Sequence, residues 1–130
     1  MIVRGIEPDV LPTSARHGLA VMTYSPLAGG WLSGRWRKDT GQQGSSRARR
    51  LPERFDLANP YNQCKLDAVE QLAELAEQAG LTLFQLAAAD VVLTADVLDR
   101  IDEIVPPGTT INPADNPFDN DALMPTARRR

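Results

Sequence analysis

The chain has little of the material from which several kinds of functional site are built. It contains one cysteine, Cys64, and one histidine among 130 residues. It can therefore form no disulfide within the chain and no structural zinc site, which usually takes four cysteine or histidine ligands. No apolar run approaches the ~20 residues that cross a bilayer. We expect no membrane contact and, with a lone cysteine, a cytoplasmic protein.

Charge is distributed unevenly along the chain. Residues 1–54 carry nine Lys and Arg against four Asp and Glu, whereas residues 55–130 carry five against thirteen. The basic half would attract an anionic ligand, although two merely solvated faces explain the pattern equally well. The arginines between 47 and 54 have no aromatic residues interleaved among them and no recognition motif, so we expect no nucleic-acid binding.

Small residues follow a short β-prone run at 19–24. The run ends at Ser25, glycines occupy positions 29, 30 and 34, and Arg35 comes next. Glycine lets a backbone approach a ligand closely, and consecutive N–H groups in such a loop can form an anion site. With the flat ring of Tyr24 before it, this segment suits a nucleotide cofactor that has a planar ring and phosphates. The alternative is a plain strand-to-loop turn.

The segment resembles the seventh strand and following loop of the aldo-keto reductases, NADPH-dependent carbonyl reductases built on a (β/α)8 barrel. The resemblance lies in Tyr-Ser-Pro-Leu at 24–27 and Gly-x-Leu-x-Gly-Arg at 30–35. It continues at residues 4–12, 17–21, 65–83 and 88–113.

The resemblance implies a cofactor role for five residues. Tyr24 would stack on the nicotinamide of NADPH. Ser25, Leu27 and Gly29 would line the pyrophosphate through hydroxyl and backbone groups. Arg35 would face a phosphate.

The chain is too short for a complete barrel of this kind, which takes ~250 residues. After residue 87 it passes to a stretch that resembles the end of the family's next helix, so an αβ unit of about 30 residues is missing. That unit carries the eighth strand and the motif that grips the adenosine 2′-phosphate. We therefore expect the α/β class, as a partial (β/α)8 TIM barrel remnant that is mostly helical with one barrel strand and long loops.

Local signals predict where the elements lie. We expect a helix at 7–17, the barrel strand at 19–24 and a mobile polar loop at 37–54. The best helix runs over 60–79, with Asn59 as its N-cap and Gly80 as its stop. Its apolar stripe consists of Leu66, Val69, Leu72, Ala73 and Ala76.

Two further helices are predicted near the C-terminus. Thr82 and Gln85 have the spacing of a capping box, which favours a helix at 83–92, and Thr94 precedes a last helix at 95–105. We expect residues 1–108 to form the C-terminal portion of the barrel and residues 109–130 to form a flexible tail.

Catalysis in this family uses a Tyr acid with Lys, Asp and His around it, and no residue of this chain matches any of the four. Tyr24 takes the stacking position, and Tyr61 begins a helix with no Lys placed near it by motif. His17 ends a helix, where the helix dipole favours a surface histidine. Ser33 lies outside a Gly-x-Ser-x-Gly elbow, so a hydrolase triad has no support. We assign no catalytic residue.

Three hypotheses follow. The first is an aldo-keto reductase-like oxidoreductase fragment, inactive alone, whose family reduces aldehydes and ketones to alcohols with NADPH. The second is the cofactor-binding half of a split enzyme, with a partner chain that completes the barrel. The third is a non-enzymatic interaction protein that uses the helix at 60–79. Because a strand at 19–24 would have unpaired edges, we expect loose packing unless a partner completes the chain.

Overall fold

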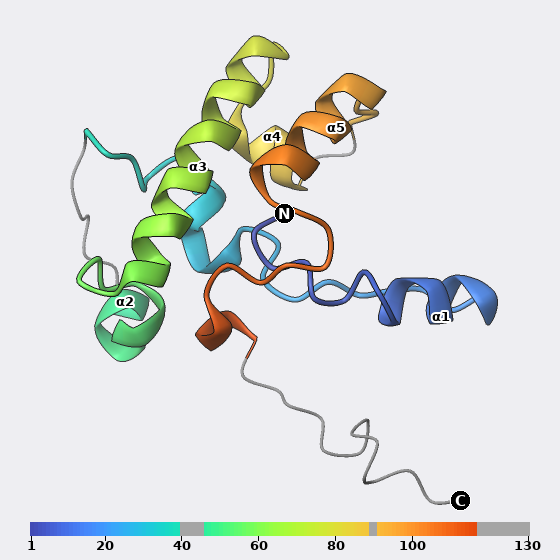
Figure 1. Ribbon diagram of the computed structural model, residues 1–130, viewed down its shortest axis with the longest axis horizontal. Helices are drawn as coiled ribbons and strands as arrows, with labels where there is room; N and C mark the ends of the chain where they lie inside the picture. The colour runs from blue at the N-terminus through green and yellow to red at the C-terminus, as the bar shows by residue number, and fades with distance from the viewer. Residues whose placement is uncertain (40–45, 89–90, 117–130) are drawn as a thin grey trace, which may run out of the picture.

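The computed structural model describes residues 1–39, 46–88 and 91–116, and these residues are mostly helical (Figure 1). In chain order the elements are α1 (Val10–Arg16), η1 (Ala28–Ser33), α2 (Ser46–Arg50), η2 (Pro52–Arg54), α3 (Pro60–Gln78), α4 (Leu83–Ala88), α5 (Ala95–Ile104) and η3 (Pro113–Asp115), where η marks a short 3-10 helix. Within these ranges no helix is long and apolar enough to span a membrane.

Helix α3 is the longest element and forms where the sequence predicts it. The Asn59 side chain accepts a hydrogen bond from the Tyr61 N–H at 3.0 Å, which satisfies a donor that a helix N-terminus leaves free. At the other end Gly80 takes a φ of 69°, and the Leu81 N–H returns to the Ala76 carbonyl at 2.8 Å. This is a Schellman C-cap, so local signals at both ends define the helix.

The core lies on one face of α3, which packs against α4, α5 and η1 (Figure 1). Val69, Leu72 and Ala76 of the predicted stripe are fully buried there, and burying a side chain such as Leu72 contributes about 1.5–3 kcal/mol. The other buried apolar residues are Ile2, Trp31, Leu32, Trp36, Phe55, Ala68, Ala73, Leu75, Leu83, Leu86, Ile101 and Val105. The stripe therefore serves the chain's own core.

The capping box at the start of α4 is present. The Gln85 N–H donates to Thr82 Oγ1 at 3.1 Å, and the Thr82 N–H donates to Gln85 Oε1 at 2.8 Å. The described part of helix α4 ends at Ala88, whereas we predicted a helix to 92. Residues 91 and 92 are not helical, and residues 89 and 90 lie outside the described part. The last predicted helix is confirmed as α5, although the Thr94 side chain makes no capping hydrogen bond.

The predicted strand at 19–24 is wrong for the described residues. The only β-type pairing among them is an isolated antiparallel bridge between Val3 and Thr110. A strand needs a neighbour to pair with, and the described residues that pair in this way are 2–4, which lie against residues 109–111. Met22 and Tyr24 are consequently 96% and 90% exposed.

The first helix is shorter than predicted and stands apart. Helix α1 covers 10–16 instead of 7–17 and buries none of its residues. Figure 1 shows it extending away from α3, α4 and α5. Val10 and Leu11 remain 46% and 39% exposed.

Two segments that we expected to be irregular contain structure. Part of the predicted loop at 37–54 forms α2 and η2, while residues 40–45 lie outside the described part. Part of the predicted tail, residues 109–116, packs on the helical body and ends in η3, whereas residues 117–130 lie outside the described part. The physical reason for the second difference is that Asn112 and the Asp115 side chain are buried in hydrogen-bonded contacts.

Candidate cofactor site

The predicted cofactor residues lie in one loop, residues 24–35. This loop follows the segment at 19–23 and contains η1. Tyr24 is exposed at its start, and Ser25 and Ala28 have φ values of 55° and 50°. Such left-handed angles are uncommon for residues other than glycine and cost about 1–3 kcal/mol each when the surroundings enforce them. The structure therefore holds this turn in a strained form, which is frequent at ligand sites.

The N–H groups of the turn are already used within it. The Ala28 N–H donates to the Ser25 carbonyl at 2.8 Å, and the Gly29 N–H donates to Ser25 Oγ at 3.0 Å. The Gly30 N–H donates to the Leu27 carbonyl at 2.9 Å. A phosphate at Gly29 would therefore have to replace the Ser25 hydroxyl as the acceptor of its N–H, and this hydroxyl is free to rotate away.

An aromatic cluster lies beneath the loop. The ring centroid of Trp31 is 4.3 Å from that of Trp36 and 5.9 Å from that of Phe55, and all three side chains are buried. Gly29 sits directly on this cluster, because a β-carbon at that position would lie 3.0 Å from Phe55 Cζ. The absence of a side chain at Gly29 thus lets the turn pack closely on its aromatic base.

Two arginines lie at the loop. Arg35 directly follows Gly34 and is exposed. Arg47 belongs to α2, yet its Cδ and one terminal nitrogen lie 3.6 and 3.7 Å from the position that a Gly29 β-carbon would take. Arg47 was not among the predicted cofactor residues. Its distance from Gly29 along the chain hides it from motif reasoning.

Below the aromatic cluster lies a buried lysine that the sequence analysis missed. Lys65 is 0% exposed, and its Nζ donates to Asp115 Oδ2 at 2.7 Å and to the Arg54 carbonyl at 2.9 Å. The same Nζ lies 4.6 Å from the centroid of the Trp31 ring, within the range of a cation–π contact. The signal that could have found it is helical spacing, because Lys65 lies four residues before Val69 on the buried stripe.

Burial dominates the ionisation of this amine. Desolvation lowers the pKa of Lys65 below its ordinary value of 10.5, the hydrogen bond and charge of Asp115 act in the opposite direction, and Arg54 adds to the lowering. The Lys65 ammonium nevertheless has two hydrogen-bond acceptors, and no buried side-chain polar atom among the described residues lacks a partner.

Two residues that the sequence analysis considered and did not assign to catalysis lie at helix ends. Tyr61 is half-exposed at the first turn of α3, and His17 is exposed at the C-cap of α1, as the sequence predicts. No group of three His, Cys, Asp or Glu residues within the described ranges is arranged to hold a metal ion.

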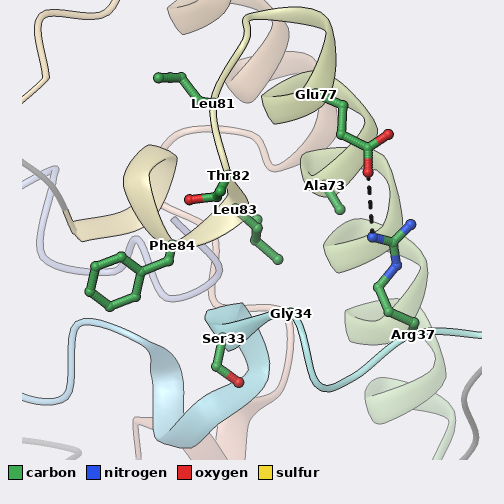
Figure 2. A pocket seen from close by; sticks show the side chains of 9 residues that line it. All are labelled: Ser33, Gly34, Arg37, Ala73, Glu77, Leu81, Thr82, Leu83 and Phe84. Carbon is green, nitrogen blue, oxygen red and sulfur yellow. Dashed lines mark ion pairs between the residues drawn. The ribbon is translucent and has the colours of Figure 1, made fainter.

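A separate cavity of about 250 Å³ opens beside the C-terminal half of α3 (Figure 2). Its lining combines apolar side chains of the α3–α4 connection with polar groups of the η1 end. The lining residues are Ser33, Gly34, Arg37, Ala73, Glu77, Leu81, Thr82, Leu83 and Phe84. Figure 2 shows Arg37 directed toward Glu77, the two side chains being 3.9 Å apart between their nearest N and O atoms. None of the five predicted cofactor residues lines this cavity.

The sequence model of the Aldo/keto reductase family matches residues 2–105, four-fifths of the chain. The chain belongs to the aldo/keto reductase family. This confirms the resemblance and shows that the chain is oxidoreductase-like. The family fold is the (β/α)8 barrel, and the described residues of this chain contain helices but no strand. No solved structure matches the chain significantly.

Several curated proteins are similar to it, including the following three. A putative voltage-gated potassium channel subunit beta of Schizosaccharomyces pombe is 36% identical over 88 residues, covering 64% of this chain and 24% of that protein. A probable voltage-gated potassium channel subunit beta of Arabidopsis thaliana is 33% identical over 91 residues, 65% of this chain and 25% of that protein. The uncharacterized oxidoreductase YrpG of Bacillus subtilis is 32% identical over 99 residues, which cover 75% of this chain and 28% of that protein. The chain thus matches about a quarter of the length of these relatives.

Proposed function

We propose that this aldo/keto reductase-family chain binds NADPH through its 24–35 loop and that it reduces no carbonyl compound alone. The exposed ring of Tyr24 offers a stacking face for the nicotinamide. Ser25, Leu27 and Gly29 present the turn to the pyrophosphate, and Arg35 supplies a charge at its far end. We expect no carbonyl reduction by the chain alone because none of its residues matches the family's Tyr, Lys, Asp and His.

The observation that carries this proposal is the position of Arg47 beside Gly29. A guanidinium next to the turn offers a second cation to a phosphate bound there, on a residue that the motif did not include. Arginine pairs with phosphate by charge-assisted hydrogen bonds, which are worth roughly twice neutral ones. The positive charge of the N-terminal half, five units over residues 1–54, favours the same ligand.

The proposal is tested by titrating the full chain with NADPH while following energy transfer from the buried Trp31 and Trp36 to the reduced nicotinamide, with calorimetry as a second readout. We expect saturable binding that Tyr24→Ala, Arg35→Ala and Arg47→Ala each weaken by about tenfold, the loss of a hydrogen bond to a charged group or a stacking contact. Arg49→Ala is the matched control, because Arg49 is an exposed arginine of the same helix α2.

A parallel titration with NADH separates the parts of the site. Because the motif that grips the adenosine 2′-phosphate has no counterpart here, the two nucleotides should bind within a few-fold of each other. No saturation with either nucleotide at millimolar concentration would contradict the proposal.

One observation favours a second function, the cofactor-binding half of a split enzyme. The backbone of residues 20–24 makes no hydrogen bond within the described part of the chain, and both Met22 within this segment and Leu19 before it are exposed. Unpaired extended backbone with apolar side chains is suited to pairing with a further strand. A partner chain that carries the preceding barrel strands and the Tyr, Lys, Asp and His set would supply both the pairing and the chemistry.

This second function is tested by co-expression with such a half-barrel chain and by the rate of NADPH oxidation with an aldehyde. Activity in the co-purified complex, lost on Val21→Pro, would support it. Val21→Pro removes a backbone donor that a paired strand needs. If the two chains fail to co-purify, the split-enzyme proposal is excluded.

A further inference from the structure

We call segment 109–116 the strap. One of its side chains, Asp115, pairs with two cations, Lys65 and Arg54, below the 24–35 loop. Asp115 of the strap holds Lys65 Nζ at 2.7 Å through one carboxylate oxygen and Arg54 Nε at 2.8 Å through the other. The Asp115 side chain is only 3% exposed. Lys65 in turn lies against the Trp31 ring of the loop.

A single carbonyl ties these groups together. The Arg54 carbonyl accepts from Lys65 Nζ at 2.9 Å and from Trp31 Nε1 at 3.3 Å. The loop indole and the buried ammonium are therefore fixed by the same acceptor. A movement of Lys65 away from this carbonyl would also remove its cation–π contact with the Trp31 ring.

The strap itself is held independently of Lys65. Asn112 Nδ2 donates to Asn62 Oδ1 at 2.7 Å and to the Glu53 carbonyl at 3.0 Å, and Asn112 Oδ1 accepts from the Ala114 N–H at 2.9 Å. Asn62 and Asn112 are both fully buried. This amide pair places η3 so that Asp115 points at Lys65 and Arg54.

We propose that Asp115 is a positioning residue of the cofactor loop: the strap holds Lys65 under Trp31, and loss of Asp115 weakens nucleotide binding some distance away at Tyr24, Ser25 and Gly29. The proposal rests on the proposed NADPH function. The contacts run without a gap from Asp115 to Lys65, from Lys65 to Trp31, and through Phe55 to Gly29. Coupling through such packed networks is typically sufficient to change an affinity about tenfold.

The physical reason is the charge of the buried amine. Lys65 faces one anion, Asp115 of η3, and one cation, Arg54 of η2. Without the carboxylate, the amine either loses its proton or draws water toward the aromatic cluster. Both outcomes remove the ammonium from the Trp31 ring and loosen the base on which Gly29 rests.

The experiment compares Asp115→Asn, Lys65→Met and the control Asp99→Asn in the full chain, Asp99 being an exposed carboxylate of α5. Two readouts are taken for each variant. The first is NADPH affinity, which we expect to fall about tenfold in both strap-network variants and to stay unchanged in the control. The second needs no nucleotide: acrylamide quenching and pH titration of the tryptophan emission.

In the second readout we expect both network variants to make the tryptophans more accessible to acrylamide. We also expect the alkaline change in emission that accompanies loss of the Lys65 proton to move to lower pH in Asp115→Asn and to disappear in Lys65→Met. A role confined to overall stability would leave the emission profile of the folded variants unchanged.

The outcomes separate this proposal from the NADPH function. If the unaltered chain fails to bind NADPH, the cofactor proposal fails, and the tryptophan readout alone decides whether the strap positions the loop. If Asp115→Asn does not fold, Lys65→Met decides, because methionine keeps the length of the side chain without its charge. Unchanged affinity and unchanged tryptophan shielding in folded variants would overturn the inference.

Discussion

The ammonium of Lys65 and the carboxylate of Asp115 form an ion pair, 2.7 Å between Nζ and Oδ2, across a separation of 50 positions in the sequence. Both side chains are almost entirely removed from water. Because Lys65 belongs to α3 and Asp115 to η3, this pair joins the last described segment to the centre of the fold, beside the Asn62–Asn112 amide contact. The pair is therefore a buried ionic contact between two distant parts of the chain, added to the amide contact that places η3.

Breaking this pair from one side should be strongly destabilising. Asp115→Ala leaves a buried ammonium without a counter-charge, for which the loss of unfolding free energy is about 3–5 kcal/mol. Urea unfolding followed by circular dichroism measures it. The control Asp99→Ala removes an exposed carboxylate from α5 and should stay within about 0.5 kcal/mol of the unaltered chain. Equal effects of the two substitutions would contradict the role given to Asp115.

The pH dependence of stability should carry the signature of Lys65. Burial lowers the pKa of Lys65 in the folded chain below its ordinary value of 10.5. At pH values between the folded pKa and 10.5, the unfolded chain binds a proton at Lys65 that the folded chain has lost. The unfolding free energy therefore rises with pH in this range and is lower at pH values below the folded pKa. The range lies on the alkaline side of the folded pKa.

This prediction is checked by difference. Unfolding free energies of the unaltered chain and of Lys65→Met are measured from pH 7 to 10, and the difference between them should rise with pH in favour of the unaltered chain. Lys38, whose pKa the neighbouring Asp67 raises, is the same in both proteins, so its contribution cancels. A flat difference would show that Lys65 keeps its ordinary pKa.

Elements defined by their own local sequence were predictable, and elements that need a distant partner were not. Helix α3 was found from Asn59, Gly80 and the spacing of Leu72 with its neighbours, all within one stretch of chain. The strand at 19–24 was not formed because its stability depends on hydrogen bonds to another strand, which no local pattern supplies. Residues 19–24 are of types that favour a strand, but the described chain pairs no other strand with them.

The candidate site divides in the same way. The 24–35 loop was located from its Gly and Ser-Pro pattern, and the cofactor roles of its five residues stay predictions. Arg47 and Lys65 were missed because each reaches the loop from another element. Asn112 was placed in a tail for the same reason, since nothing near it in sequence reveals that Asn62 would be its partner.

The capping box of α4 provides a third prediction with an internal control. Thr82→Ala removes the acceptor of the Gln85 N–H, and loss of such a cap lowers the unfolding free energy by about 1 kcal/mol. Thr94 takes the same position before α5 but makes no capping hydrogen bond, so Thr94→Ala should have almost no effect. Thermal unfolding of the two variants measures the contrast, and a larger loss for Thr94→Ala would contradict the described hydrogen bonds.

Gly29 should tolerate a side chain less well than Gly34, although both have left-handed backbone angles. The φ of Gly29 is 73° and that of Gly34 is 81°, so alanine strains both sites by about 1 kcal/mol. At Gly29 the added carbon would also lie 3.0 Å from Phe55 Cζ, whereas at Gly34 nothing lies within 4 Å. Overpacking costs about 1–3 kcal/mol more.

Gly29→Ala should therefore lose about 2–4 kcal/mol of unfolding free energy, the sum of backbone strain and overpacking, against about 1 for Gly34→Ala. Urea unfolding of both variants gives the difference. Because the added methyl group pushes on Phe55 and through it on Trp31, the emission of the folded Gly29→Ala chain should also change, while that of Gly34→Ala should not. If the two variants lose equal stability and keep the same emission, the loop does not rest on the aromatic cluster as described.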